Sequence, residues 1–309
     1  MSASGAYRAL APAKVNLGLF LGPPRAADGR HELVSVMQSI SLADELTLEP
    51  APPEALADEL LCPGLAGPPQ ENLAARALAA FREATGWDSP PLRLSVHKRI
   101  PVAAGLGGGS ADAAAALRLA RHASGLGDEA LLRELGAALG ADVPAQIAPG
   151  RWLASGAGER LAQLPDPLPT LELLVLPFAA QLSTAAVYRA ADDLGLARGM
   201  RELDHVRAQL ARSLELGAPL PAARELLHND LQPAALSLLP GVGRALAAVA
   251  DAGAELALVS GSGPTVIGLF AHANAAGRVR RALLDLSDRD PAPLAASSVG
   301  AAFGAVVEM

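Results

Sequence analysis

Apolar and polar residues alternate with a period of two in several short stretches of the chain. This pattern predicts strands, because successive side chains of a strand point to opposite faces of a sheet. In the first half, the predicted strands cover residues 15–22, 34–42, 45–50 and 92–100, with at least one short strand within 140–158. In the second half they cover residues 171–177, two stretches of 255–270 around a turn, and 303–308.

Apolar residues spaced three and four apart predict helices between these strands. The predicted helices cover residues 72–86, 110–125, 128–140, 184–194, 200–215, 242–252 and 274–286. Asn72 is suited to cap the first of them, and Gly86 to end it. Because strands and helices mix in both halves without a strict β-α-β alternation, we expect an α+β fold.

A proline-rich segment divides the chain. At 309 residues the chain is longer than a single core usually grows, which favours two domains with a cleft between them. The segment PDPLPT at 165–170 holds three prolines in five residues, a composition that suits a connection. We therefore predict an N-terminal domain of residues 1–165 and a C-terminal domain of residues 166–309.

The net charge and the distribution of apolar residues indicate which kinds of binding partner the protein lacks. The net charge is −7 and no block of basic residues occurs, so we expect no nucleic-acid partner. We find no charge-free apolar run of about 18 residues and no secretory signal pattern at the N-terminus, so we expect a cytoplasmic protein without a membrane partner. The single cysteine, Cys62, predicts neither a disulfide nor a zinc site.

The basic residues are distributed unevenly between the two types. Of 25 basic residues, 23 are arginine and two are lysine, Lys14 and Lys98. A coding bias accounts for the rarity of lysine but not for the two places where it occurs, in APAKVNL and in HKRIP. A compact ammonium group fits where a planar guanidinium does not, so both lysines are candidate site residues.

The stretch PVAAGLGGGSAD at 101–112 places four glycines in five positions just before a predicted helix. Such a loop directs backbone N–H groups and the positive end of the helix dipole at one point, as phosphate binding requires. It is not a Walker A loop, which needs a lysine between Gly109 and Ser110, and it departs from the dinucleotide pattern because Ser110 replaces the last glycine. A flexible linker is the remaining alternative.

Three motifs in order carry a resemblance to a known family. The stretch KRIP-x-AAGLGGGSADAA (98–114) resembles the phosphate loop of the GHMP small-molecule kinases, APAKVNL (11–17) resembles their N-terminal motif, and SGSGPTV (260–266) is similar to their third motif. The further stretches ADGRHEL (27–33), LGADVP (139–144) and NDL (229–231) resemble the branch whose substrate carries a cytidine diphosphate group.

The resemblance implies a two-domain GHMP kinase architecture with the active site in the interdomain cleft. It implies ATP-dependent phosphorylation of a hydroxyl of a cytidine diphosphate derivative, in the non-mevalonate route to isoprenoid precursors, with ATP and Mg²⁺ as cofactors. It assigns no side chain to the metal ion. Two alternatives stay open from the sequence: another GHMP kinase acting on homoserine or phosphomevalonate, and a nucleotide-binding protein without catalysis.

The resemblance also implies roles for single residues. Asp142 corresponds to the catalytic base and Lys14 to the cation beside it, although an aspartate next to glycine and proline is also typical of a turn. The implied ATP-binding residues are Pro101, Val102, Ala103, Ala104, Gly105, Leu106, Gly107, Gly108, Gly109, Ser110 and Ala111, with Lys98 and Asn72 beside the adenine. For Asn72, the helix-cap role is the alternative.

The implied substrate-binding residues are Asn16, Arg30, His31, Thr184 and Tyr188. Members of the family commonly have a tyrosine that stacks on cytosine where this chain has Arg30, and a guanidinium plane can also stack on a base. Tyr188 follows Thr184 by four residues, so both are expected on one helix face. A histidine in a polar loop is often simply exposed, and this is the alternative for His31.

Overall fold

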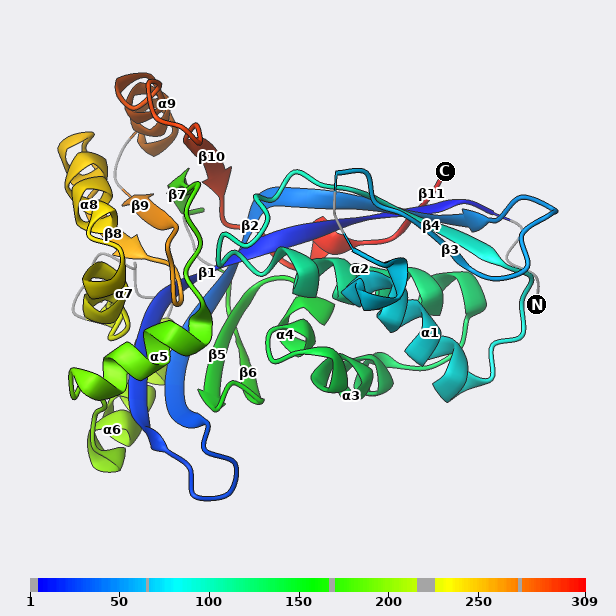
Figure 1. The fold of residues 1–309 in the computed structure, drawn as a ribbon, viewed down its shortest axis with the longest axis horizontal. Helices are drawn as coiled ribbons and strands as arrows, with labels where there is room; N and C mark the ends of the chain where they lie inside the picture. Colours follow the sequence, from blue (N-terminus) through cyan, green and yellow to red (C-terminus); the bar gives the residue numbers. More distant parts are fainter. Residues whose placement is uncertain (1–4, 65–66, 167–169, 216–225, 272–273) are drawn as a thin grey trace.

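The computed structural model describes residues 5–64, 67–166, 170–215, 226–271 and 274–309. The described elements form two sheets with helices packed against them (Figure 1). The chain passes from the first sheet to the second between Leu164 and Glu172. Residues 167–169 of the predicted boundary lie outside the described residues, and the division into domains 1–165 and 166–309 stays a prediction.

The first sheet has seven strands and is built around two long ones. Its elements are β1 (Tyr7–Pro24), β2 (His31–Pro50), β3 (Glu59–Leu61), β4 (Leu92–His97), β5 (Arg151–Gly156), β6 (Arg160–Leu164) and β11 (Val307–Glu308). The order is β11-β1-β2-β4-β3, and β5 pairs with both β2 and β6. The last strand of the chain therefore returns to the first sheet, where it pairs with β1.

Four helices cover one side of the first sheet (Figure 1). They are α1 (Leu73–Thr85), α2 (Gly108–Ser124), α3 (Glu129–Leu139) and α4 (Val143–Ile147), and a short 3-10 turn (Pro69–Glu71) precedes α1. The alanine-rich α2 is the central one, and its small side chains allow close packing against α1 and β1. This packing fixes the start of α2 next to the middle of β1.

The second sheet has four antiparallel strands in the order β10-β7-β9-β8. Its strands are β7 (Glu172–Leu176), β8 (Leu256–Val259), β9 (Val266–Phe270) and β10 (Leu294–Ser297). The helices of this half are α5 (Thr184–Asp193), α6 (Met200–Glu215), α7 (Gln232–Leu238), α8 (Gly241–Asp251) and α9 (Ala275–Asp285), and a 3-10 turn at Ala301–Gly304 precedes β11.

One apolar core connects the two sheets. It joins Val15 and Leu17 of β1 to Leu173 and Val175 of β7 and to Leu203 of α6, all of them buried. Burial of this apolar surface stabilises the arrangement in which α6 packs against β1 and β2. The central part of β1 therefore packs against α2 and also against the core that it shares with β7 and α6.

Four predicted strands needed correction. Residues 34–42 and 45–50 are one continuous strand, β2, because Asp44 is buried within it and does not interrupt it. The strand predicted at 92–100 ends at His97. Of 303–308 only Val307–Glu308 is a strand, and a 3-10 turn precedes it. The elements β3, α4, β6, α7 and β10 were not predicted.

No helix among the described residues has the length and apolar content needed to cross a membrane.

Candidate active site

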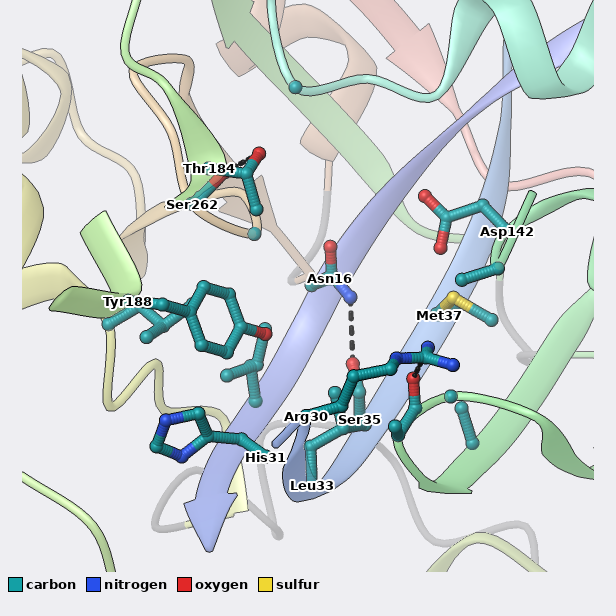
Figure 2. A pocket seen from close by; sticks show the side chains of 18 of the residues that line it. Asn16, Arg30, His31, Leu33, Ser35, Met37, Asp142, Thr184, Tyr188 and Ser262 are labelled. Carbon is teal, nitrogen blue, oxygen red and sulfur yellow. Dashed lines mark hydrogen bonds between the residues drawn. The ribbon is translucent and has the colours of Figure 1, made fainter. Parts of the chain in front are cut away.

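A cavity of about 710 Å³ lies where the two halves meet, and Figure 2 shows the side chains around it. Elements from both halves contribute to its wall: β1, β2, the loop before α2, the turn before α4, helix α5 and the loop between β8 and β9. The predicted site residues that line it are Lys14, Asn16, Arg30, His31, Gly105, Gly107, Ser110, Asp142, Thr184 and Tyr188. The fold thus brings together residues that are up to 174 positions apart (Lys14 to Tyr188).

Lys14 and Asp142 form an ion pair in this cavity. The Lys14 Nζ lies 3.2 Å from Asp142 Oδ2, and the side chains are 11% and 36% exposed, respectively. Asp142 occupies the cap position before α4 but makes no capping hydrogen bond with its side chain. Its carboxylate is therefore available to a ligand in the cavity, with a cation beside it.

Asn16 orients the ammonium group of Lys14. Its Oδ1 accepts a hydrogen bond of 2.8 Å from Lys14 Nζ, and its Nδ2 donates one of 2.7 Å to Ser35 Oγ, which donates in turn to Gly18 O. Figure 2 shows the contact between Asn16 and Ser35. This buried relay fixes the amide orientation, since only the oxygen can face the ammonium. Ser35 was not predicted as a site residue.

The glycine loop fits closely between β1 and the loop after β8. Gly107 has φ +69°, and a Cβ there would lie 2.9 Å from Lys14 Cγ; a Cβ on Gly105, at φ +75°, would lie 2.7 Å from Gly263 O. Lys14 N–H donates to Leu106 O, and Thr265 Oγ1 donates to Ala104 O. Positive φ and the close approach of neighbouring chain segments therefore require glycine at positions 105 and 107.

A second cavity, of about 430 Å³, lies on the other side of the glycine loop. The predicted site residues that line it are Asn72, Lys98, Pro101, Val102, Ala103, Ala104, Gly105, Leu106, Gly107, Gly108, Gly109 and Ser110. Ala111 is buried in α2 and lines neither cavity. Asn72 does cap α1, because its Oδ1 accepts from Ala74 N–H at 2.9 Å.

Lys98 makes two ion pairs at the edge of this second cavity, which the sequence did not reveal. Its Nζ lies 2.5 Å from Asp44 Oδ2 and 2.7 Å from Asp112 Oδ2. Burial lowers the pKa of Lys98, but the two carboxylates outweigh it and the net pKa is raised. Burial, with the charge of Asp44 adding to it and that of Lys98 opposing it, raises the pKa of Asp112 to about 7.

His31 is buried at the opposite end of the first cavity. Its Nδ1 lies 2.8 Å from Gly22 O, and its Nε2 lies 3.1 Å from Asp192 Oδ1. The ring packs against Tyr188, with 5.4 Å between centroids. The alternative of an exposed loop histidine is therefore wrong, and Asp192 is a neighbour that the sequence motifs did not indicate.

Arg30, Tyr188 and Thr184 also line this cavity. The Arg30 guanidinium donates to Ala157 O at 2.7 Å. In Figure 2 the guanidinium points away from the Tyr188 ring, towards the side on which Met37 and Asp142 lie. Burial raises the pKa of Tyr188 to about 12. Thr184 Oγ1 lies 3.0 Å from Ser262 Oγ and so connects α5 to the loop after β8.

Comparisons with known proteins agree with this architecture. The model of the GHMP kinases N terminal domain matches residues 72–150, and that of the GHMP kinases C terminal domain matches residues 208–287. The fold and the glycine loop thus define a GHMP kinase, a class of ATP-dependent small-molecule kinases.

The relatives narrow the class. The chain is 42% identical to 4-diphosphocytidyl-2-C-methyl-D-erythritol kinase of Anaeromyxobacter dehalogenans over 86% of this chain and 82% of that protein, and 40% identical to the same kinase of Xanthobacter autotrophicus over 90% and 94%. A crystal structure of 4-(cytidine 5'-diphospho)-2C-methyl-D-erythritol kinase is similar, with a TM-score of 0.74, 32% identity and coverage of 95% of this chain and 99% of that one. The chain belongs to this kinase family.

A homoserine kinase from Cytophaga hutchinsonii is similar in fold alone. Its TM-score is 0.73 at 16% identity, and 99% of each chain is covered. The comparison shows that the two sheets and their helices can serve different substrates. The identity of the substrate therefore depends on the residues of the cavity.

Proposed function

We propose that the chain transfers the γ-phosphoryl group of ATP to the 2-hydroxyl of 4-diphosphocytidyl-2-C-methyl-D-erythritol, giving the 2-phosphate and ADP in the non-mevalonate route to isoprenoid precursors. The observation that carries the proposal is the Lys14–Asp142 pair, 3.2 Å apart, in a cavity that also contains the glycine loop and the His31–Tyr188 pair. The named relatives support the choice of substrate.

In this proposal Asp142 accepts the proton of the attacking hydroxyl. Its carboxylate is partly exposed to the cavity and makes no capping bond, so it can face a substrate oxygen. Lys14, oriented by Asn16, stabilises negative charge on that oxygen and on the transferring phosphoryl group. Because Lys14 and Asp142 lie near the start of α2, they position the substrate hydroxyl next to the γ-phosphate.

ATP occupies the glycine loop, with its phosphates at the N-terminus of α2 and its adenine in the second cavity. Mg²⁺ belongs to the proposal as the companion of the phosphates. It keeps several waters and needs only one or two protein oxygens when phosphates bind it. The described residues contain no group of three His, Cys, Asp or Glu side chains able to hold a metal without them.

The cytidine end of the substrate lies between Arg30 and Tyr188. The Arg30 guanidinium replaces an aromatic ring as one stacking plane, and Tyr188 provides the other. His31 recognises the base from the buried side, and Thr184 and Asn16 contact the rest of the substrate. We expect the enzyme to work in the cytoplasm, with no nucleic-acid partner, in line with its net charge of −7.

An assay of ADP release tests the proposal. Turnover with 4-diphosphocytidyl-2-C-methyl-D-erythritol should exceed that with homoserine or phosphomevalonate by at least about 100-fold, because these smaller alcohols lack the cytidine group and so lose its contacts in the transition state. Phosphorus NMR of the product should place the new phosphate on the 2-hydroxyl. Preference for another alcohol would assign the chain to a different substrate, and ATP binding without turnover of any alcohol would contradict a catalytic function.

A further inference from the structure

The three charged side chains Asp44, Lys98 and Asp112 meet at the base of the glycine loop. Asp44 comes from β2, Lys98 directly follows β4, and Asp112 lies in the second turn of α2. Their ion pairs are 2.5 and 2.7 Å long. The side chains of the two aspartates are 0% and 5% exposed, so the cluster is a buried one.

The cluster joins the two ends of the loop. Lys98 precedes the glycines and Asp112 follows them, 14 residues later, so their ion pair closes the loop at its base. Asp44 Oδ1 also accepts from the backbone N–H groups of Arg99 and Ile100, at 2.5 and 2.8 Å. A Cβ on Gly108 would lie 3.4 Å from Lys98 Nζ, which shows how closely the ammonium group approaches the start of α2.

The charges of the cluster do not balance when both aspartates are ionised. Two carboxylates face one ammonium group, which leaves one negative charge in a buried place. Asp112 Oδ1 is also buried and has no hydrogen-bond partner among the described residues. An unpartnered carboxylate oxygen next to a second carboxylate favours a proton on the pair.

We propose that Asp44, Lys98 and Asp112 form an ionic clip that fixes the glycine loop for ATP, and that Asp112 carries a proton when ATP is bound. The inference rests on the proposed function, because it places the ATP phosphates at the start of α2. A triphosphate at that helix end repels a second uncompensated negative charge in the same helix. ATP binding and protonation of Asp112 therefore favour each other.

The other titratable groups near the clip do not replace Asp112 in this role. Glu71 lines the same cavity from the segment before α1, but it is exposed. The Cys62 thiol lies in the electrostatic field of the clip, and burial raises its pKa, so it stays neutral near pH 7. The pKa of Asp112, raised by burial to about 7, puts its protonation within the range that an assay can scan.

The test is the pH dependence of ATP binding. If ATP binds the protonated clip, the KM for ATP of the parental enzyme rises up to roughly tenfold between pH 6 and pH 8, and kcat changes less. Calorimetry of ATP binding near pH 7.5, in two buffers of different ionisation enthalpy, should show net proton uptake. ATP itself titrates in this range, so each result is compared with that of variants under the same conditions.

Two single variants neutralise the clip. Both Asp112→Asn and Asp44→Asn leave one carboxylate and one ammonium group, and in Asp44→Asn the new amide oxygen can still accept from the backbone N–H groups. We expect each to flatten the KM profile and to reduce the proton uptake. Glu129→Gln, which alters an exposed pair with Arg133 on α3, is the matched control and should keep the parental profile. Use of both variants keeps the test decisive if one of them folds poorly.

The possible results separate the inference from the proposed function. Parental pH dependence and proton uptake in Asp112→Asn would overturn the inference, whatever the substrate. The variants could lose the pH dependence and the proton uptake while the parental enzyme phosphorylates no cytidine substrate. This result would contradict the proposed function but would support the ionic clip. ATP binding that is unchanged in Gly107→Val would show that the phosphates lie elsewhere and would overturn the inference as well.

Discussion

The two lysines of this chain occupy two contrasting charged centres on either side of the glycine loop. Lys14 pairs with a single carboxylate, and that carboxylate, on Asp142, is 36% exposed to a large cavity. Lys98 pairs with two carboxylates that are almost completely buried. The difference teaches that the same ion-pair chemistry can serve two purposes, depending on whether a carboxylate remains accessible.

The accessible centre is suited to chemistry and the closed centre to holding structure. A carboxylate that faces a cavity can accept a proton from a ligand, whereas one that is buried against an ammonium group has no access to it.

Asp142→Asn should produce the largest effect. The amide keeps the shape of the side chain but cannot accept the proton, so we expect kcat to fall by roughly 10²–10⁴-fold while the affinity for ATP stays within a few-fold. Steady-state kinetics with the cytidine substrate, together with calorimetry of ATP binding, measures both. A fall of less than about tenfold in kcat would leave Asp142 only a positioning role.

Asp112→Asn should change how the stability of the protein depends on pH. Because the folded-state pKa of Asp112 is raised to about 7, the folded state binds a proton that the unfolded state releases above about pH 4. The stability from this group is thus present at low pH and is lost as the pH rises to about 7.

The free energy of unfolding of the parental protein should therefore fall relative to that of Asp112→Asn, by about 2 kcal/mol between pH 5 and pH 8. Urea unfolding at both pH values measures the difference, with Glu129→Gln as the surface control. A constant difference across this range would mean that Asp112 titrates alike in the folded and unfolded chain.

Arg30→Ala should have the smallest effect and should distinguish the two cavities. Loss of a stacking plane raises the KM for the cytidine substrate by roughly fivefold, in line with about 1 kcal/mol for such a contact, and leaves the KM for ATP nearly unchanged. Arg30→Tyr should restore the parental value. Equal changes in both KM values would instead mean that Arg30 acts on folding or on closure of the cavity, through its hydrogen bond to Ala157 O.

The sequence motifs predicted the composition of the main cavity well. Lys14, Asn16, His31, Asp142 and Tyr188 come from separate segments, yet all of them line one cavity. Their roles as catalytic and binding residues remain predictions. Each motif is a short run of characteristic residue types, so it can be recognised in a single sequence.

The closed centre could not be predicted, because it depends on contacts between distant segments. Asp44 interrupts the apolar alternation of β2, which is why two strands were predicted where one exists. In the structure the carboxylate is paired with Lys98, 54 residues away, so the strand continues through it. The same carboxylate accepts from Arg99 and Ile100 N–H, which explains why β4 ends before them. Short elements such as β3 and α4 carry too few residues for a periodic signal.

Exchange of each lysine for arginine tests the contrast between the two centres most directly. A Cβ on Gly107 would lie 2.9 Å from Lys14 Cγ, so the glycine loop passes close to the Lys14 side chain. The ammonium group lies between Asn16 and Asp142, and a longer, planar guanidinium would move the charge away from this position. Lys14→Arg should lower kcat by about 100-fold and change the KM for ATP little. Lys98→Arg should raise the KM for ATP and change kcat little. A folded Lys14→Arg enzyme whose kcat lies within a few-fold of the parental value would contradict the catalytic role of this centre.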